Sequence, residues 1–441
     1  MLDYKIKKTP GNTEWFRQDR FGMFIHFGLY SMSAIHEWYK TTDKIFDKDY
    51  DKYFKYFNPD LFDAKEWAKK AKKAGMKYAV LTTKHHEGFC MFDSKYTDYK
   101  ITNTAFGRDL VKEYVDAFRA EGLKIGFYYS LIDWHHPEFP IDGIHPRRDD
   151  GEEMDRGRDM KKYTQYLRNQ VEELMTNYGK IDIIWFDYAT PNPDPVAHMA
   201  FDKAHPAPDR DPKPWYQYAG RKGKEEYESE KLVKMIRSYQ PEIIINDRLD
   251  YPQDIFTPEQ VTPTEWRKDP ETGEYLTWEA CHTFSGVWGY SRDEVTWKTP
   301  EMLINLLIRT VSLGGNLIMN VGPTSRGCFD ERADSALDVY AKWMRLNGRS
   351  IYSCTMADSQ FTPPQGCMLT QSVDGKRLYV HLIEYPFNEL RISNLSDKID
   401  YVQFLHDGSE IKYTVKDGTV AFEMPVLMIQ KIVPVIEIFL K

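Results

Sequence analysis

The feature that most constrains the fold is a repeated alternation of short apolar runs and amphipathic segments. The first apolar run, FGMFIHFG at 21–28, predicts a buried strand. Further strands are predicted at 77–83, 124–131, 181–188, 242–247 and 316–322. Helices are predicted at 63–75, 108–122, about 157–178, about 225–239, 299–315 and about 330–347. Near-continuous apolar strands that alternate with helices indicate a parallel sheet covered on both faces.

The number of these units favours a closed α/β barrel over an open sheet. At least six strand–helix units fall within about the first 345 residues, which fits a (β/α)8-like (TIM-type) barrel. A doubly wound sheet stays open as an alternative, although no GxGxxG motif follows the first strand. The strands are least well defined between 249 and 298.

The pattern changes after Gly348. Apolar and polar residues alternate there, and three Asp-Gly turns separate short predicted strands. We therefore expect two domains, a (β/α)8-like barrel over 1–349 and a small antiparallel β domain over 350–441.

Charge and composition narrow the choice of partner. The formal net charge of −8 argues against nucleic acid. No segment reaches the roughly 18–20 apolar residues of a membrane span. Five cysteines without a CxxC motif indicate neither a zinc knuckle nor a disulfide scaffold. The compartment stays open: cytoplasmic as the N-terminus stands, or periplasmic, secreted or lysosome-like if a signal peptide has been removed. The oligomeric state is equally open.

Polar and aromatic residues gather at the predicted carboxyl ends of five strands. In a barrel these ends meet at one face, so the residues predict one pocket. A carboxylate that ends an apolar strand must be hydrogen-bonded, paired or used, and its converging neighbours favour use over loop capping for Asp187. The group comprises His26, Lys84, His85, His86, Glu87, Tyr128, Tyr129, Trp185, Asp187, Asn246, Asp247 and Arg248.

The adjacent histidines His85 and His86 suit a polyol ligand better than a metal ion. Successive strand residues point to opposite faces, so both rings reach one ligand only beyond the strand end. The sequence contains no HExxH motif, and we expect neither a metal nor another cofactor. A metal-dependent hydrolase is the weakest alternative, and a purely structural role stays open for either histidine alone.

Seven blocks, in this order, resemble the α-L-fucosidases of glycoside hydrolase family 29. The resemblance runs from about residue 15 to 350. It implies a (β/α)8-like barrel, a C-terminal β-sandwich, no metal, and retaining double-displacement hydrolysis of terminal α-L-fucose from fucosylated oligosaccharides or glycoconjugates. The blocks are WFRQDRFGMFIHFGLYSMSAIHEWY (15–39), KHHEGFCMFDSKYTDY (84–99), GFYYS (126–130), IIWFDY (183–188), NDR (246–248), WEACHTFSGVWGY (278–290) and GGNLIMNVGPTSRG (314–327).

The resemblance also implies roles for individual residues. Asp187 corresponds to the nucleophile of the family, and a glutamate after the NDR block to the general acid/base. We favour Glu259 in FTPEQ, with Glu265 and Glu279 as alternatives. The residues that resemble the sugar-binding set of the family are His26, Glu37, Trp38, His85, His86, Tyr128, Trp185, Arg248 and Trp288.

Three features depart from the family pattern. Phe27 follows His26 where the family usually has tryptophan, and Tyr188 follows Asp187 where a small residue is common. Both changes concern packing more than chemistry. The block around 189–225 is longer than usual, which bears on the preference for the leaving group.

Two other functions stay open on the sequence alone. L-galactose differs from L-fucose only by a hydroxyl on C6, so a slightly roomier pocket would make the protein an α-L-galactosidase. A non-catalytic sugar-binding protein on the same barrel would follow if no glutamate faced Asp187 across the pocket.

Overall fold

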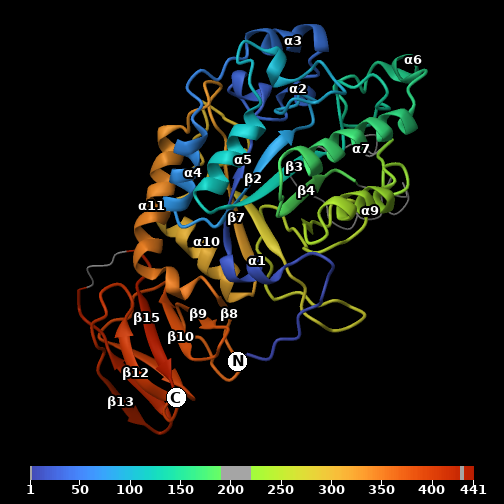
Figure 1. Cartoon of the computed structure of the whole chain (residues 1–441). Coiled ribbons are helices and arrows are strands. Elements are labelled where there is room, and N and C mark those ends of the chain that lie inside the picture. The colour runs from blue at the N-terminus through green and yellow to red at the C-terminus, as the bar shows by residue number, and fades with distance from the viewer. Residues whose placement is uncertain (1, 190–219, 428–431) are drawn as a thin grey trace.

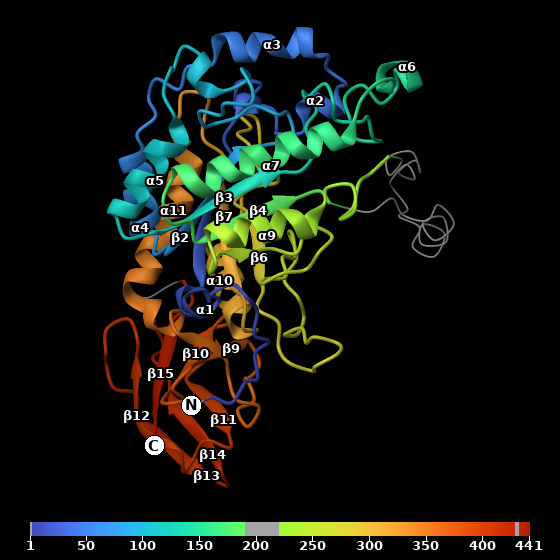
Figure 2. The ribbon, with the colours of Figure 1, turned by 45° about the vertical axis from the view of Figure 1, so that its right-hand side comes forward.

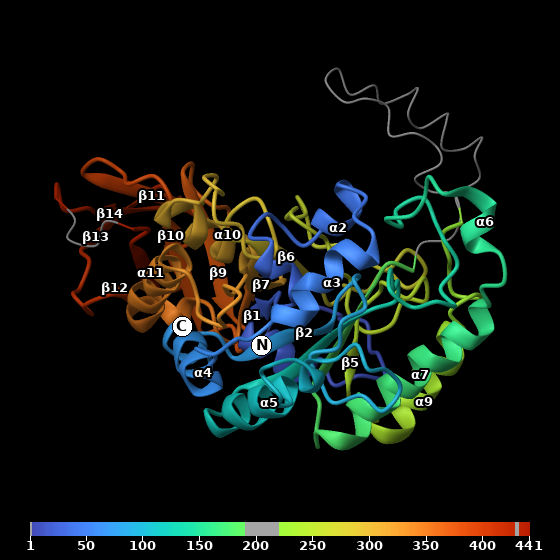
Figure 3. The same ribbon diagram turned by 90° about the horizontal axis from the view of Figure 1, so that it is seen from above.

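The computed structural model of the protein describes residues 2–189, 220–427 and 432–441. Its centre is a seven-stranded sheet with the order β5-β4-β3-β2-β1-β7-β6, in which every neighbouring pair is parallel. The sheet curves into a (β/α)8-like barrel, as predicted (Figure 3). Its strands are β1 (Phe21–Ile25), β2 (Tyr78–Lys84), β3 (Lys124–Ser130), β4 (Ile183–Asp187), β5 (Ile244–Ile245), β6 (Glu279–Thr283) and β7 (Asn316–Val321).

Six predicted helices lie on the outside of these strands (Figure 3). Local signals set their starts: Asp63 caps the first of them by accepting from the backbone N–H groups of Lys65 and Glu66. Thr299 caps another, with proline at its first position. The six are α4 (Ala64–Lys73), α5 (Leu110–Ala120), α7 (Met160–Asn177), α9 (Ser229–Tyr239), α10 (Pro300–Ser312) and α11 (Glu331–Asn347).

Shorter helices lie in the segments before and between the barrel strands. Two of them, α2 (Tyr39–Thr42) and α3 (Asp47–Tyr56), lie in the long connection between β1 and β2 at the same end of the molecule as α6 (Gly151–Asp155) (Figure 1). Another, α1 (Glu14–Asp19), precedes β1. Within the described part of the chain, no helix is long and apolar enough to cross a membrane.

The barrel differs from the prediction between β5 and β6. The strand expected at 242–247 is only two residues long, and β6 was not predicted because its sequence, EACHT, has no apolar run. An irregular segment, 255–260, fills the gap: it forms parallel bridges from Ile255 to Asn246 and from Glu259 to Cys281. This segment therefore carries Glu259 to the carboxyl end of the barrel.

The barrel interior is packed beneath that end. All seven residues of β2 are buried, and a cluster that includes Phe24, Tyr78 and Trp185 fills the space between the strands. Each fully buried large side chain contributes roughly 1.5–3 kcal/mol. The strands consequently form a rigid base for the side chains at their ends.

The C-terminal region forms two antiparallel sheets, of orders β12-β15-β10-β9-β8 and β11-β14-β13, around a hydrophobic core of its own. All three Asp-Gly pairs lie between successive strands, as predicted. Figures 1 and 2 show this region below the barrel. Its strands are β8 (Cys354–Met356), β9 (Cys367–Ser372), β10 (Arg377–Leu382), β11 (Glu389–Ser393), β12 (Ile399–Phe404), β13 (Tyr413–Lys416), β14 (Thr419–Glu423) and β15 (Val435–Leu440).

We propose the domain boundary at 349/350, where α11 has just ended. The two parts are joined by Arg20, which is 2% exposed. Its Nε donates to the carbonyl of Cys354 at 2.8 Å, and its Nη1 donates to the carbonyl of Gly314 at 2.7 Å. One side chain thus links the first β8 residue to the loop before β7.

Candidate active site

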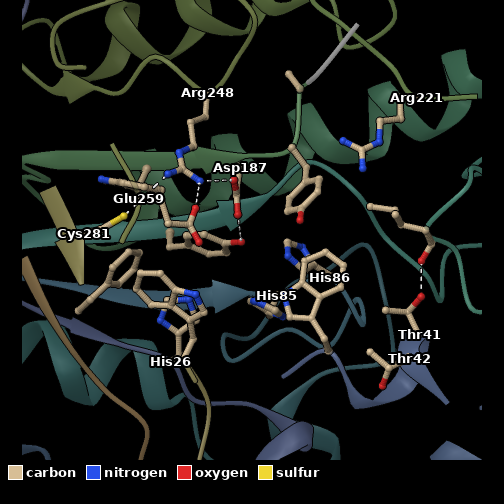
Figure 4. Close-up of a pocket in the computed structure, with 18 of the residues that line it drawn as sticks. His26, Thr41, Thr42, His85, His86, Asp187, Arg221, Arg248, Glu259 and Cys281 are labelled. Carbon is tan, nitrogen blue, oxygen red and sulfur yellow. Dashed lines mark hydrogen bonds and ion pairs between the residues drawn. The ribbon is translucent and has the colours of Figure 1, made fainter. Parts of the chain in front are cut away.

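A cavity of about 810 Å³ opens at the carboxyl ends of the parallel strands. Asp187, Glu259 and the residues that resemble the sugar-binding set all line it except Glu37. Four members of the predicted strand-end group do not line it: Lys84, Glu87, Tyr129 and Asn246. Two strand-end side chains, His26 and Asp187, therefore meet in space as the sequence predicted. Figure 4 shows the carboxylates and Arg248 facing a group of imidazole rings across this cavity.

One guanidinium nitrogen connects the two candidate catalytic carboxylates. Nη1 of Arg248 lies 3.0 Å from Oδ1 of Asp187 and 2.6 Å from Oε2 of Glu259 (Figure 4). Those two oxygens are therefore at most about 5.6 Å apart, the sum of 3.0 and 2.6 Å. The carboxyl groups of retaining glycosidases are separated by about 5–5.5 Å.

Arg248 is held in place by the irregular segment 255–260, the closing segment of the barrel. Its Nη2 donates to the carbonyl of Thr257 at 3.1 Å, and its guanidinium lies 4.6 Å from the centre of the Trp185 ring. Burial alone would lower the pKa of Arg248, but the carboxylates of Asp187 and Glu259 and the Cys281 thiol raise it well above its ordinary value. The guanidinium is thus a permanent positive charge between the two acids.

His26 is a neutral hydrogen-bond acceptor at the cavity. Asn320 donates from Nδ2 to the carbonyl of Trp288 at 2.6 Å, so its Oδ1 must accept from Nδ1 of His26, 2.6 Å away. Burial and the neighbouring His85 hold the pKa of His26 well below 6.5. Its Nε2 therefore carries a lone pair.

His86 is also a neutral imidazole with a free Nε2 lone pair, but its Nδ1 has a different partner. Ser130 donates from Oγ to the carbonyl of Ile132 at 2.8 Å, so Nδ1 of His86 donates to Oγ at 2.7 Å. Burial, followed by the neighbouring His85, lowers the pKa of His86 well below its ordinary value. Two neutral imidazoles can therefore accept hydrogen bonds from hydroxyl groups.

Aromatic rings complete the wall. The Trp288 ring centre lies 5.1 Å from that of His26, and the Trp38 ring centre lies 5.1 Å from that of His86. Glu37 supports this wall instead of lining it: Oε2 accepts from the backbone N–H groups of Trp288 at 3.2 Å and Gly289 at 2.8 Å. Flat apolar faces beside hydroxyl acceptors suit a sugar ring.

Comparison with known proteins identifies the family of the chain. The family model for α-L-fucosidases matches residues 4–349, which span the whole barrel. The chain belongs to the α-L-fucosidase family, glycoside hydrolase family 29. This confirms the predicted family and hydrolase class, and the fold that the family shares agrees with the barrel and the antiparallel C-terminal sheets.

Three relatives show how far the similarity of this α-L-fucosidase extends. Human plasma α-L-fucosidase is 28% identical over 411 residues, which cover 84% of this chain and 76% of that protein. The structure of α-L-fucosidase isoenzyme 1 from Paenibacillus thiaminolyticus is 40% identical, with a TM-score of 0.87 over 97% of this chain and 98% of that one. A Bacteroides thetaiotaomicron family 29 α-L-fucosidase, trapped as a covalent intermediate with 2-fluoro-fucosyl fluoride in a Glu-to-Gln mutant, is 26% identical; the TM-score is 0.81, over 100% of this chain and 99% of that one.

The structure also separates the three candidate acid/base glutamates of this α-L-fucosidase. Glu259 lines the cavity, whereas Glu265 is exposed and is not among the lining residues. Glu279 is fully buried behind the Trp185 ring, where it accepts from Nε1 of Trp185 at 3.1 Å and from the hydroxyl of Tyr78. Burial raises the pKa of Glu279 to about 7. Only Glu259 shares a partner with Asp187.

Sequence reasoning missed the outer wall of the cavity. Those residues come from α2 and from connecting loops without an apolar strand pattern, so spacing gave no signal for them; they are Thr41, Thr42, Gly143, Ile144, Arg148, Ala189 and Arg221. Asp247 and Cys281 also line the cavity, and both stand in blocks quoted from the sequence. The part of the long 189–225 block from 190 to 219 lies outside the described residues.

Tyr188 follows Asp187, where the family commonly has a small residue, and it packs into the aromatic wall of the cavity. Its backbone has a φ of 75°, in the left-handed region that a small residue or glycine adopts more easily. Its ring centre lies 5.4 Å from that of Trp38 and 4.8 Å from that of His86. The Tyr188 ring therefore packs against Trp38 and His86 in the wall of the cavity.

No group of three or more His, Cys, Asp or Glu side chains with the arrangement of a metal site occurs within residues 2–189, 220–427 and 432–441.

Proposed function

We propose that this protein releases terminal α-L-fucose from fucosylated oligosaccharides or glycoconjugates, with Asp187 as nucleophile and Glu259 as general acid/base. The observation that carries the proposal is the separation of at most about 5.6 Å between oxygens of these two side chains, the sum of 3.0 and 2.6 Å through Arg248. A separation within that bound falls below the roughly 6.5–9.5 Å that an inverting reaction needs for its water and agrees with a retaining reaction.

In the first step Asp187 attacks the anomeric carbon while Glu259 gives its proton to the glycosidic oxygen. The carbon–oxygen bond to the leaving group breaks and a fucosyl ester of Asp187 forms. In the second step Glu259 takes a proton from water, which attacks the same carbon and releases L-fucose with retained configuration. The trapped intermediate of the Bacteroides thetaiotaomicron enzyme supports this two-step course.

Tyr128 and Arg248 hold the nucleophile in place for this attack. Tyr128 donates from its hydroxyl to Oδ2 of Asp187 at 3.0 Å, and Arg248 donates to Oδ1. Both oxygens of Asp187 therefore have a donor before substrate arrives, which fixes the carboxylate in one orientation.

The facing wall would recognise the fucosyl unit. Nε2 atoms of the neutral His26 and His86 accept from ring hydroxyls, and the Trp288 and Phe24 rings supply apolar surface for the C5 methyl group. A C6 hydroxyl at that apolar surface would lose its hydrogen bonds to water, which disfavours L-galactosides. Rates on 4-nitrophenyl α-L-fucoside and α-L-galactoside, measured side by side, test this preference.

The outer part of the cavity would receive the leaving group. A volume of about 810 Å³ exceeds the space of a single monosaccharide. Thr41 and Thr42 lie away from the carboxylates (Figure 4), and Arg148 donates to the carbonyl of Thr41 at 3.0 Å. We therefore assign these residues to the aglycone, and hence to linkage preference.

Azide rescue tests the two catalytic roles. Asp187→Gly should lose at least three orders of magnitude in kcat and yield β-L-fucosyl azide, because azide attacks in place of the missing nucleophile. Glu259→Ala should yield α-L-fucosyl azide from an activated fucoside, because the ester still forms. Glu265→Ala is the matched control and should keep wild-type rates. The same azide anomer from both variants, or rescue of neither, would refute the assignment.

Stereochemistry gives an independent check. Proton NMR of the wild-type reaction should show α-L-fucose first, followed by mutarotation. An initial β-anomer would show direct inversion and would contradict the double-displacement mechanism.

A further inference from the structure

Three buried polar atoms without a hydrogen-bond partner lie directly behind the cavity. They are Nδ1 of His85 and both carboxylate oxygens of Glu87. Oε2 of Glu87 lies 3.5 Å from Nδ1 of His85, and the Glu87 residue is 1% exposed. A carboxylate is rarely buried in this way unless a nearby group depends on it.

The space around Glu87 is built to keep the carboxylate there. An added methyl group at Gly28 would come within 2.7 Å of Oε1 of Glu87. Three tyrosines lie near enough to feel the charge of the same carboxylate: burial first, then the Glu87 charge, raises the pKa of Tyr30, Tyr50 and Tyr99. Among the described residues, His85 is the basic group within ion-pair distance of Glu87.

His85 differs in this respect from the other two imidazoles. Nδ1 of His26 is held by the amide oxygen of Asn320, and Nδ1 of His86 by the hydroxyl of Ser130, both neutral groups. His85 alone of the three faces a carboxylate.

The two nitrogens of His85 have different surroundings. Nδ1 is enclosed next to Glu87, whereas Nε2 is not among the enclosed unpaired atoms of the described residues, and His85 lines the cavity. The ring therefore turns Nδ1 toward Glu87 and leaves Nε2 for a ligand.

We propose that Glu87 is a positioning residue that acts on the substrate through His85. Its carboxylate accepts from Nδ1–H of His85, fixes which nitrogen carries that proton, and keeps Nε2 directed at a hydroxyl of the sugar in the cavity. The inference rests on the proposed function, because the hydroxyl belongs to the fucosyl unit. Sugar binding would shorten the 3.5 Å contact into a hydrogen bond.

A double-mutant cycle tests the coupling. In wild type, Glu87→Gln should lower kcat/KM on 4-nitrophenyl α-L-fucoside about tenfold to a hundredfold, the usual effect of one hydrogen bond to a charged group. In a His85→Asn background, the same substitution should change kcat/KM less than threefold, because the ring through which Glu87 acts is gone. Equal losses in both backgrounds, or wild-type rates for Glu87→Gln, would overturn the proposal.

Two controls separate positioning from damage to the fold. Glu173→Gln replaces another buried glutamate, whose oxygens accept from Ser94 and from the backbone of Lys95, and should leave kcat/KM unchanged. Glu87→Asp keeps the charge and should recover part of the activity lost in Glu87→Gln. If Glu87→Gln lost its folded circular dichroism while Glu87→Asp folded with wild-type rates, the position of the carboxylate would be irrelevant and the proposal wrong.

Nitrogen NMR reads the proton directly. With ¹⁵N-labelled histidine, and His85→Asn to assign the signal, Nδ1 of His85 should have the shift of a protonated nitrogen in wild type and move in Glu87→Gln. An unmoved signal would contradict the proposal. Binding of L-fucose to Asp187→Asn separates a failure of the proposed function from a failure of the role of Glu87. If the variant does not bind L-fucose and wild type does not turn over fucosides, the proposed function is refuted. If wild type turns over normally but the Nδ1 signal does not move in Glu87→Gln, only the role of Glu87 is refuted.

Discussion

The hydroxyl of Tyr128 donates a hydrogen bond to Oδ2 of Asp187 at 3.0 Å, from the strand beside the one that carries the aspartate. Burial, with the Asp187 charge next in importance, raises the pKa of Tyr128 well above its ordinary value. The phenol therefore keeps its proton near neutral pH and donates to the carboxylate, which helps to hold Asp187 at the cavity.

Removal of this donor should slow the reaction. We expect Tyr128→Phe to lower kcat on 4-nitrophenyl α-L-fucoside about tenfold to a hundredfold, because Asp187 loses one of its two donors and its fixed orientation. Tyr129→Phe is the matched control: its hydroxyl donates to Gln170 on the opposite side of β3, at 2.7 Å. Comparable losses in both variants would point to strand damage and against a specific role of Tyr128.

Glu279 should make folding stability depend on pH. Burial raises its pKa to about 7 from an ordinary value of 4.5, so the folded state binds the proton more tightly than the unfolded state. The resulting stabilisation is complete below about pH 4.5 and is lost as pH rises through about 7. We expect wild type to lose ~3 kcal/mol relative to Glu279→Gln between pH 4.5 and pH 8.

Urea unfolding of both proteins at several pH values measures this difference. Because Glu279→Gln lacks the titrating group, other pH effects cancel in the comparison. A difference in unfolding free energy that stayed constant from pH 4.5 to 8 would show that the buried carboxyl does not titrate in this range.

The sequence predicted those parts of the site that lie on regular strands. His26, Tyr128 and Asp187 each end an apolar run, and parallel strands bring such ends together without further information. Arg248 follows the fifth predicted strand. The resemblance to family 29 then gave Glu259, a glutamate after the NDR block, which spacing alone would not have connected to Asp187. The site follows from local periodicity and from that resemblance.

The remaining features depend on contacts that have no local signal. β6 is built from EACHT, whose buried polar side chains hide its strand character, and the closing segment 255–260 pairs with it through only isolated bridges. Glu37 was expected at the sugar; one of its carboxylate oxygens, Oε2, accepts from the backbone of Trp288 and Gly289, a contact that no local pattern predicted. Such long-range pairing is decided by tertiary packing, which a single sequence does not show.

Arg20 should be essential for stability at the junction of the two proposed domains. Arg20→Met removes the donors to the carbonyls of Cys354 and Gly314 and leaves both buried oxygens without them, at an expected cost of about 3 kcal/mol. The control Arg326→Met breaks a solvent-exposed pair with Asp60 and should leave the unfolding free energy close to that of wild type. Equal unfolding free energies for the two variants would refute a joining role for Arg20.

Arg148 should affect the leaving group without affecting the chemistry. Its Nη1 donates to the carbonyl of Thr41 and to that of His145, both at 3.0 Å, so the side chain links α2 to the loop that contains residues 145–148. We expect Arg148→Ala to lower kcat/KM on a fucosylated trisaccharide about tenfold, and on 4-nitrophenyl α-L-fucoside less than threefold. The neighbouring Arg147 does not line the cavity in the described structure and pairs with Asp150, so Arg147→Ala is the matched control. A loss of the same size on both substrates would place the effect of Arg148 at the carboxylates and not at the aglycone.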